Sequence, residues 1–174
     1  MIQLLKLSLL FVALTLFSCQ HSLLPVIVVR QNPSAAELFA AQEIRRYLYL
    51  RTGEIAAIDK LDADAAIPAY AIVLSVDNNL PAESFSLRTA DNRLHISGGS
   101  EIAALYGSYR FAEHLGVRFY LHGDVVPDGQ IKRFRLPVIS ETHTPQFATR
   151  GLNPFHDFPE GPDWWTLDEY KAIL

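Results

Sequence analysis

The stretch LHISGGSEIAALYGSYRFAEHLGVRFY, residues 94–120, decides the fold of this chain. It begins with alternating apolar and polar residues, a pattern typical of a half-buried strand, and the Gly-Gly-Ser sequence at 98–100 ends that strand. Serine is a good helix N-cap, so the next residues predict a helix that ends at Gly116. A further short strand is predicted over Val117–Tyr120. The apolar face of the helix is predicted to consist of Ile102, Leu105, Tyr106, Tyr109 and Ala112.

A strand and a helix are predicted near the start of the domain. The β-branched run Pro25–Val29 is typical of a buried strand. Ser34 and Glu37 form the S-x-x-E capping-box pattern, so we expect a helix from there to a stop at Gly53. The predicted apolar stripe of this helix consists of Ala36, Phe39, Ala40, Ile44, Tyr47 and Leu48.

More strands are predicted between the two helices. Residues 54–69 show no clean periodicity and are interpreted as a loop, and Tyr70–Val76 is predicted to be a strand. The turn residues Ala90–Arg93 interrupt an alternating pattern over 85–97, which indicates a β-hairpin. The order β-α-β-β-β-α-β gives an α+β domain, residues 26–140, in which two helices pack on one face of a mixed sheet.

An export signal is predicted before this domain. Residues 1–18 contain one charge, Lys6, followed by the apolar run Leu7–Phe17, as in a secretory signal peptide. The chain's only cysteine, Cys19, follows directly, and Leu16–Cys19 resembles a bacterial lipobox. We therefore expect a lipoprotein-type signal with Cys19 as the lipidation site. An ordinary signal peptide with a chance cysteine is the alternative.

The lipid defines the expected localisation. Residues 19–25 are a linker, and acyl chains rather than a helix would hold the exported protein to a bacterial membrane. No acidic run follows Cys19, so a periplasm-facing anchor is expected before a cell-surface one.

Composition and motifs exclude several other classes of protein. The 174 residues include 15 Lys+Arg and 19 Asp+Glu, with a net charge of −4 and no basic run, so nucleic-acid binding is not expected. One cysteine provides neither an intramolecular disulfide nor a cysteine-type zinc site. Gly98-Gly99 lacks the rest of a phosphate-binding motif, and the six histidines form no zinc-protease motif. Neither a cofactor nor a metal site is expected.

The composition changes toward the C-terminus. Ile131–Leu136 is interpreted as one more strand and residues 141–146 as a linker. Residues 147–174 are predicted to start a β/α barrel, with a strand, an aromatic- and proline-rich loop over 153–165, and a helix that opens with a capping box at Thr166. The sequence ends two turns into that helix, so the barrel is expected to be incomplete in this chain.

The block from Gly98 to Tyr120, with Gly123-Asp124 and Val126-Pro127, resembles a known domain. It is similar to the N-terminal α+β domain that precedes the catalytic barrel in glycoside hydrolase family 67 α-glucuronidases. A similar accessory domain precedes the barrel of family 20 β-hexosaminidases. The resemblance covers about residues 26–145, and Arg150-Gly151 resembles the start of the family 20 barrel. It implies that this domain is not the catalyst and that the catalytic carboxylates come from later barrel strands.

The candidate substrate-binding residues are Arg150, Asp157, Trp164 and Trp165. The resemblance implies that Arg150 hydrogen-bonds to sugar hydroxyls, and a structural ion pair is the alternative. The two tryptophans offer flat faces that stack on a pyranose ring or, alternatively, pack the barrel base. Glycoside hydrolysis needs two carboxyl groups flanking the bond. The loop acids Asp157, Glu160 and Asp163 lie among prolines, where solvated turn residues are more common, so no catalytic residue is assigned.

The sequence thus predicts the non-catalytic N-terminal part of an exported glycoside hydrolase, similar to α-glucuronidases, that degrades polysaccharides or oligosaccharides. Its expected partners are a carbohydrate, through the barrel part, and a membrane, through the lipid. The chain alone is expected to be inactive. The alternatives are a stand-alone lipoprotein that binds glycans without cleaving them and a purely structural or assembly domain.

Overall fold

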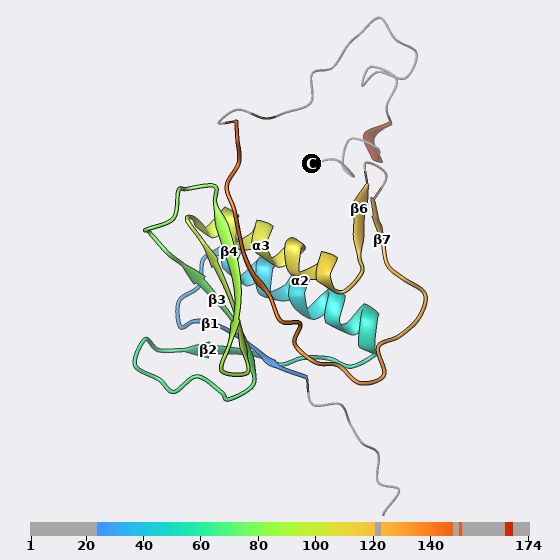
Figure 1. Ribbon diagram of the computed structural model, residues 1–174, viewed down its shortest axis with the longest axis horizontal. Helices are drawn as coiled ribbons and strands as arrows, with labels where there is room; N and C mark the ends of the chain where they lie inside the picture. The colour runs from blue at the N-terminus through green and yellow to red at the C-terminus, as the bar shows by residue number, and fades with distance from the viewer. Residues whose placement is uncertain (1–23, 121–122, 148–149, 151–165, 169–174) are drawn as a thin grey trace, which may run out of the picture.

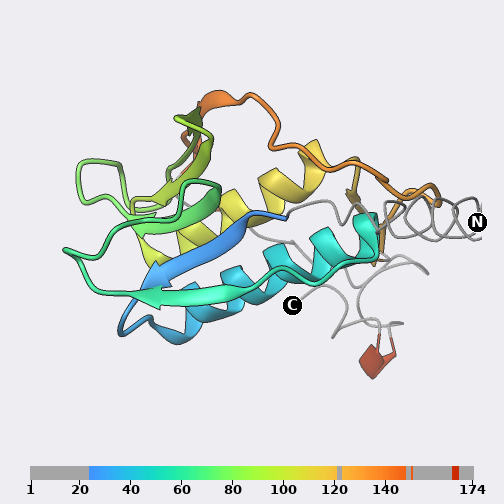
Figure 2. The ribbon, with the colours of Figure 1, turned by 90° about the horizontal axis from the view of Figure 1, so that it is seen from below.

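The structure, a computed structural model, describes residues 24–120, 123–147, 150 and 166–168. Two helices cover one face of a six-stranded mixed sheet, which confirms the predicted α+β class (Figures 1 and 2). These described residues contain no closed barrel. The elements are β1 (Val26–Arg30), α2 (Ala35–Thr52), β2 (Ile58–Leu61), β3 (Ala71–Val76), β4 (Phe85–Ala90), β5 (Arg93–Gly98), α3 (Glu101–His114), β6 (Arg118–Tyr120), β7 (Gly123–Val125) and β8 (Ser140–His143).

The predicted signal peptide, Cys19 and nearly all of the expected barrel segment lie outside the described residues. Of residues 147–174, the structure describes only Phe147, Arg150 and Thr166–Asp168. The predicted strand, loop and helix of a barrel therefore stay predictions.

The sheet has the strand order β2-β1-β3-β5-β4-β8. β2, β1, β3 and β5 run parallel, and β4 and β8 add an antiparallel edge. Parallel neighbours need a crossover connection, and α2 provides it between β1 and β2. β6 and β7 form a separate antiparallel ribbon beyond the helices (Figure 1).

The helix caps and the hairpin were predicted correctly from local sequence patterns. The Ser34 hydroxyl accepts a hydrogen bond from the Glu37 amide at 3.2 Å, and the Glu37 carboxylate accepts one from the Ser34 amide at 2.7 Å, so the capping box is confirmed. Gly53 ends α2 with φ +79°, a left-handed conformation that glycine adopts without strain. Asp91 and Asn92 have φ of 49° and 64°, the two positive values that a type I′ hairpin turn requires.

The predicted apolar face of α3 is wrong at Ile102 and Tyr106, which are exposed. The face that packs on the sheet carries small residues, among them Ala104 and Gly107, together with Phe111. A Cβ on Gly107 would lie 2.7 Å from Cγ2 of Ile96 on β5, so the helix backbone sits close to the sheet. Leu105 and Tyr109 are half-buried, and Ala112 is buried as predicted.

The predicted stripe of α2 differs from the structure at one large residue. Phe39 is exposed, whereas Ala41 and Arg51 join the buried side of the helix. The Arg51 guanidinium is satisfied there by backbone carbonyls: it donates to Leu115 O and Pro127 O, each at 2.8 Å, and to Gly129 O. A buried charge with this many acceptors is tolerated in a core, and it ties α2 to the end of α3.

Two short strands at the edges of the six-stranded sheet, and β7 of the ribbon, lie where the sequence indicated none. β2 falls within the predicted loop 54–69, and β8 takes up residues of the predicted linker 141–146. Both are four-residue strands that pair at the sheet edges. Half of the residues of β2 and all of those of β8 are polar, so neither has an apolar alternation to reveal it. Conversely, Ile131–Leu136 forms no strand, and the Ile131 amide donates to Arg51 O at 2.6 Å instead.

We predict that Gly99→Ala lowers the free energy of unfolding by about 1–3 kcal/mol, because a Cβ there overlaps the Pro81 carbonyl and the turn must move. The Gly99 amide also donates to Ser84 O at 2.8 Å, a bond that this movement weakens. Denaturant unfolding followed by circular dichroism measures the change. Gly129→Ala is the matched control, because nothing lies within 4 Å of its Cβ position. Equal stability of the two variants would contradict the steric argument.

Candidate functional site

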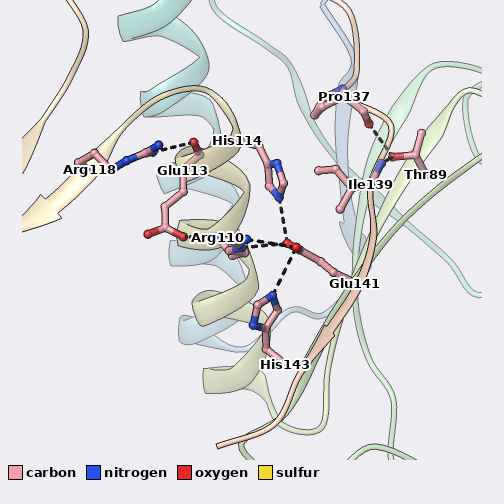
Figure 3. Close-up of polar contacts among 9 residues, drawn as sticks. All are labelled: Thr89, Arg110, Glu113, His114, Arg118, Pro137, Ile139, Glu141 and His143. Carbon is pink, nitrogen blue, oxygen red and sulfur yellow. Dashed lines mark hydrogen bonds and ion pairs between the residues drawn. The ribbon is translucent and has the colours of Figure 1, made fainter.

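The densest group of charged side chains joins α3 to the edge strand β8 (Figure 3). Arg110 and His114 lie one helical turn apart on α3, and Glu141 and His143 lie two apart on β8, so each pair shares a face of its element. We call these four residues the Glu141 clasp. Figure 3 shows the other three side chains converging on the Glu141 carboxylate.

Both oxygens of Glu141 are engaged. Arg110 donates through Nε to Oε1 at 2.9 Å and through Nη2 to Oε2 at 3.2 Å, a two-point contact that fixes the carboxylate plane. Nε2 of His114 lies 2.9 Å from Oε1. Nε2 of His143 lies 3.5 Å from Oε2, an ion-pair separation without a hydrogen bond, and this nitrogen is buried with no other partner among the described residues. The His143 ring stacks on Phe85, with centroids 5.0 Å apart.

These contacts decide the protonation of Glu141. The Arg110 hydrogen bonds are the largest cause, and despite partial burial they lower the pKa of Glu141 from 4.5 to about 2, with further help from His114 and His143. The same contacts raise the pKa of Arg110 above its ordinary value. A carboxylate with this pKa is ionised at neutral pH, so it does not serve as the general acid of a glycoside hydrolase. The chemistry of the clasp is attachment of β8 to α3.

A second group of polar side chains joins α2 to the β6–β7 ribbon. The Tyr47 hydroxyl donates to Oδ2 of Asp124 at 2.9 Å and accepts from Nη1 of Arg46 at 2.9 Å, and Arg46 also donates to Oδ2 of Asp124 at 3.2 Å. Tyr47 packs edge-on against Phe119 and Tyr109, with centroid separations of 5.7 and 6.4 Å. Burial raises the pKa of Tyr47 above its ordinary value, and Asp124 adds to this. Burial likewise raises the pKa of Tyr109 to about 12, so both phenols are neutral donors.

A third group fastens the start of both helices to β1. Arg30 donates to Oε2 of Glu37 at 2.9 and 2.6 Å and to Oε1 of Glu101 at 3.0 Å. The first turns of α2 and α3 therefore lie side by side at the end of β1. The Gly98-Gly99 turn before α3 is occupied by protein contacts, as the tight-turn interpretation predicts.

A groove of about 550 Å³ lies at the carboxyl ends of β1 and β3. It is lined by Val28–Asn32, by Val73–Ser75 and by residues of segment 61–67. The polar residues of this lining include Gln31, Asn32 and Asp62, a composition that suits a hydroxylated ligand. The sequence analysis missed this groove because one wall is the stretch interpreted as a featureless loop.

Of the predicted substrate-binding residues, only Arg150 is described. It donates to Oε2 of Glu83 and to Phe147 O, each at 2.6 Å, so it forms the ion pair named as its alternative role. Asp157, Trp164, Trp165 and the lipidation site Cys19 lie outside the described residues. Within the described ranges there is no group of three or more side chains that could hold a metal ion, and no helix there is long and apolar enough to cross a membrane.

The sequence matches no protein-family model and no curated protein. Its fold is similar to part of BtGH115A, a family GH115 4-O-methyl-α-glucuronidase with specificity for decorated arabinogalactans. The TM-score is 0.54 at 18% identity, over 71% of this chain and 18% of that chain. It is also similar to the Flavobacterium johnsoniae chitobiase FjGH20, with a TM-score of 0.47 at 20% identity over 74% of this chain and 18% of that one.

A third similar structure is a GH138 enzyme that targets pectin rhamnogalacturonan II. Its TM-score is 0.41 at 19% identity, over 53% of this chain and 13% of that chain. The chain thus spans less than a fifth of the length of each of these three glycoside hydrolases. At 18% identity the likeness to BtGH115A shows a shared fold, and it does not single out family 67.

We predict that Glu141→Gln lowers the free energy of unfolding by about 1–3 kcal/mol at pH 7. Because folding depresses the pKa of Glu141 to about 2, its contribution is complete above pH 4.5 and is lost as the pH falls toward 2. The difference between wild type and Glu141→Gln should therefore shrink over that window. Urea unfolding at pH 7, 4.5 and 2.5 measures it.

Glu113→Gln is the matched control for this prediction. Glu113 also accepts from Arg110, at 2.8 Å, but it lies three residues away on the same helix. Such a pair contributes only about 0.5 kcal/mol or less. Two results would refute the role of the clasp. One is a loss of unfolding free energy in Glu141→Gln that is as large at pH 2.5 as at pH 7, and the other is a loss no greater than that of Glu113→Gln.

Proposed function

We propose that this chain is the non-catalytic N-terminal part of an exported glycoside hydrolase that acts on a glucuronic-acid-containing glycan. The observation that carries the proposal is the likeness to the GH115 α-glucuronidase, which covers 71% of this chain but 18% of that enzyme. A domain of this fold thus forms a small part of a larger carbohydrate-active protein. The resemblance of the Gly98–Tyr120 block to family 67 α-glucuronidases supports the same substrate class.

The use of the described carboxylates supports a non-catalytic role. Glycoside hydrolysis requires one protonated and one ionised carboxyl group on either side of the scissile bond. Glu141 is ionised and bound on both oxygens, Glu37 holds Arg30 and a helix cap, and Asp124 accepts from Tyr47 and Arg46. These three carboxylates connect elements of the fold, which agrees with a catalytic pair on later barrel strands, as the proposal requires.

Substrate contact is proposed for the residues that start the barrel: Arg150, Asp157, Trp164 and Trp165. Arg150 is exposed and already pairs with Glu83, so a sugar hydroxyl would share or replace that partner. The groove beside β1 favours a second candidate, a lipoprotein that binds glycans without cleaving them, because amide and carboxylate residues are among those that line it.

We predict that the 174-residue chain does not hydrolyse aryl α-glucuronides, glucuronoxylan oligosaccharides or decorated arabinogalactan. A reading frame that continues beyond Leu174 should encode a protein that hydrolyses at least one of them, because it supplies the missing carboxylates. The release of reducing sugar ends measures hydrolysis by the 174-residue chain and by the longer protein. Hydrolysis by the short chain would overturn the proposal. Glycan binding without hydrolysis by a protein that stops at Leu174 would favour the second candidate.

We further propose that lipid on Cys19 anchors the exported protein to a bacterial membrane, in a periplasm-facing orientation. Cys19→Ala should release the protein into the soluble fraction, because the acyl chains supply the membrane affinity. Fractionation with a blot against the chain measures the release. Ser22→Ala, three residues along, is the matched control and should stay with the membrane. Membrane association of Cys19→Ala equal to that of the control would refute the anchor.

A further inference from the structure

Two hollows lie on the face of the sheet that points away from the helices. Figure 2 shows α2 and α3 on one side of the sheet. The first hollow is the groove at the ends of β1 and β3, and the second, of about 310 Å³, lies where β4 pairs with β8. Neither lining includes a residue of α2 or α3, both of which the structure describes in full. We call this uncovered side of the sheet the open face.

The strand register places four hydroxyl side chains in one row across the open face. Ser75 pairs with Ser97, Ser97 with Ser86, and Ser86 with Thr142, on β3, β5, β4 and β8. Side chains alternate along a strand, so the neighbours of these four lie on the helix side, where Ile96 is fully buried. Adjacent strands are about 4.8 Å apart, so the row spans about 14 Å. It connects the two hollows, because Ser75 lines the groove and Ser86 and Thr142 line the second hollow.

The hydroxyls of this row have hydrogen-bonding capacity to spare. The hydroxyls of Ser75 and Ser97 bond to each other at 2.9 Å, which uses one of their two donors. The hydroxyls of Ser86 and Thr142 make no hydrogen bond to another described residue. A hydroxyl both donates and accepts. The row therefore suits a ligand that itself carries many hydroxyl groups, as a carbohydrate does.

The next row of the open face carries positive charge. Arg88 on β4 pairs with His95 on β5 and with Ser140 on β8. Arg88 is exposed and forms no ion pair with another described residue, whereas Arg30 at the groove is held by two carboxylates. The one acid on strands β3, β4, β5 and β8 is Glu141, whose carboxylate is held by α3 on the other side. A guanidinium binds a carboxylate through two parallel hydrogen bonds. The open face thus fits a hydroxylated anion.

We propose that the open face binds an acidic oligosaccharide, with a uronic-acid carboxylate at Arg88 and sugar hydroxyls along the row from Ser75 to Thr142. The site is built on paired strands and is separate from the residues that start the barrel. This inference rests on the proposed function for the class of sugar and deepens it, because the domain then holds the glycan that the catalytic part cleaves.

Binding of a glucuronic-acid-substituted xylo-oligosaccharide to the 174-residue chain tests the proposal. The matched ligand is the same oligosaccharide with its carboxyl group reduced to an alcohol, and isothermal titration measures the affinity for each. The wild-type chain should bind the acidic form more tightly. Arg88→Gln should weaken binding of the acidic form by about tenfold and leave the reduced form unchanged, because only the carboxylate needs the guanidinium. Thr142→Val keeps the side-chain shape without the hydroxyl and should weaken both by about threefold.

Arg133→Gln is the matched control. It removes the same charge from an exposed side chain close to Ile131, which hydrogen-bonds to Arg51 at the end of α2. This variant should bind both oligosaccharides as the wild type does. Circular dichroism checks that each variant is folded, and the comparison of the two ligands on the wild-type chain needs no variant.

Three results would overturn the proposal. The first is a wild-type chain that binds neither oligosaccharide or binds both equally. The second is an equal loss of affinity in Arg88→Gln and Arg133→Gln, which would indicate general attraction of charge. The third is a loss in Arg150→Gln without one in Arg88→Gln, which would place the ligand at the start of the barrel. These titrations do not measure hydrolysis, so they leave the proposed function to its own test.

Discussion

The close approach of α3 to the sheet is the constraint on which the rest of the structure depends. Gly107 allows the helix backbone to pass against Ile96, and the Gly98-Gly99 turn allows it to start directly after β5. Larger residues at these places would force the helix away from the strands. With α3 at this depth, its first turn reaches Arg30 and its last turns reach β8.

Charged contacts then fix the parts that the core does not reach. Arg30 joins β1 to the first turns of both helices, the Glu141 clasp joins α3 to β8, and Asp124 joins the β6–β7 ribbon to α2. Each site pairs a carboxylate with at least one arginine, and at the clasp and Asp124 the groups are partly shielded from water. Shielding makes such pairs stronger than exposed ion pairs. Glu37, Glu101, Asp124 and Glu141 thus serve as connectors between elements.

The sequence was informative where the signal is local. Ser34, Glu37, Gly53 and Asn92 determine their own neighbourhood, so the helix limits and the hairpin could be predicted. The orientation of α3 could not be predicted from the sequence. Both sides of this helix carry apolar residues, and the size and hydrophobicity of the residues do not determine which side packs on the sheet. The small residues of α3 that are buried, Ala103, Ala104, Gly107 and Ser108, were the available signal.

The charged sites show the same limit. Arg150 was found through the resemblance, but its partner Glu83 lies 67 residues away, and Arg110 and Glu141 are 31 apart. No local pattern links residues at such separations. The alternation Ser140-Glu141-Thr142-His143 could have indicated a strand with one charged face. Its four residues were too few to distinguish it from a linker.

The two borders of the sheet have a consequence for how this protein meets other chains. One border is β2, with Asp59 and Lys60 exposed, and the other is β8, whose side chains are held by the clasp. Short borders with charged residues resist the addition of a foreign strand, which is a common route to aggregation. Other proteins are therefore expected to contact this domain through its side-chain surfaces and not through the backbone edges of the sheet. Binding to such surfaces depends on complementary shape.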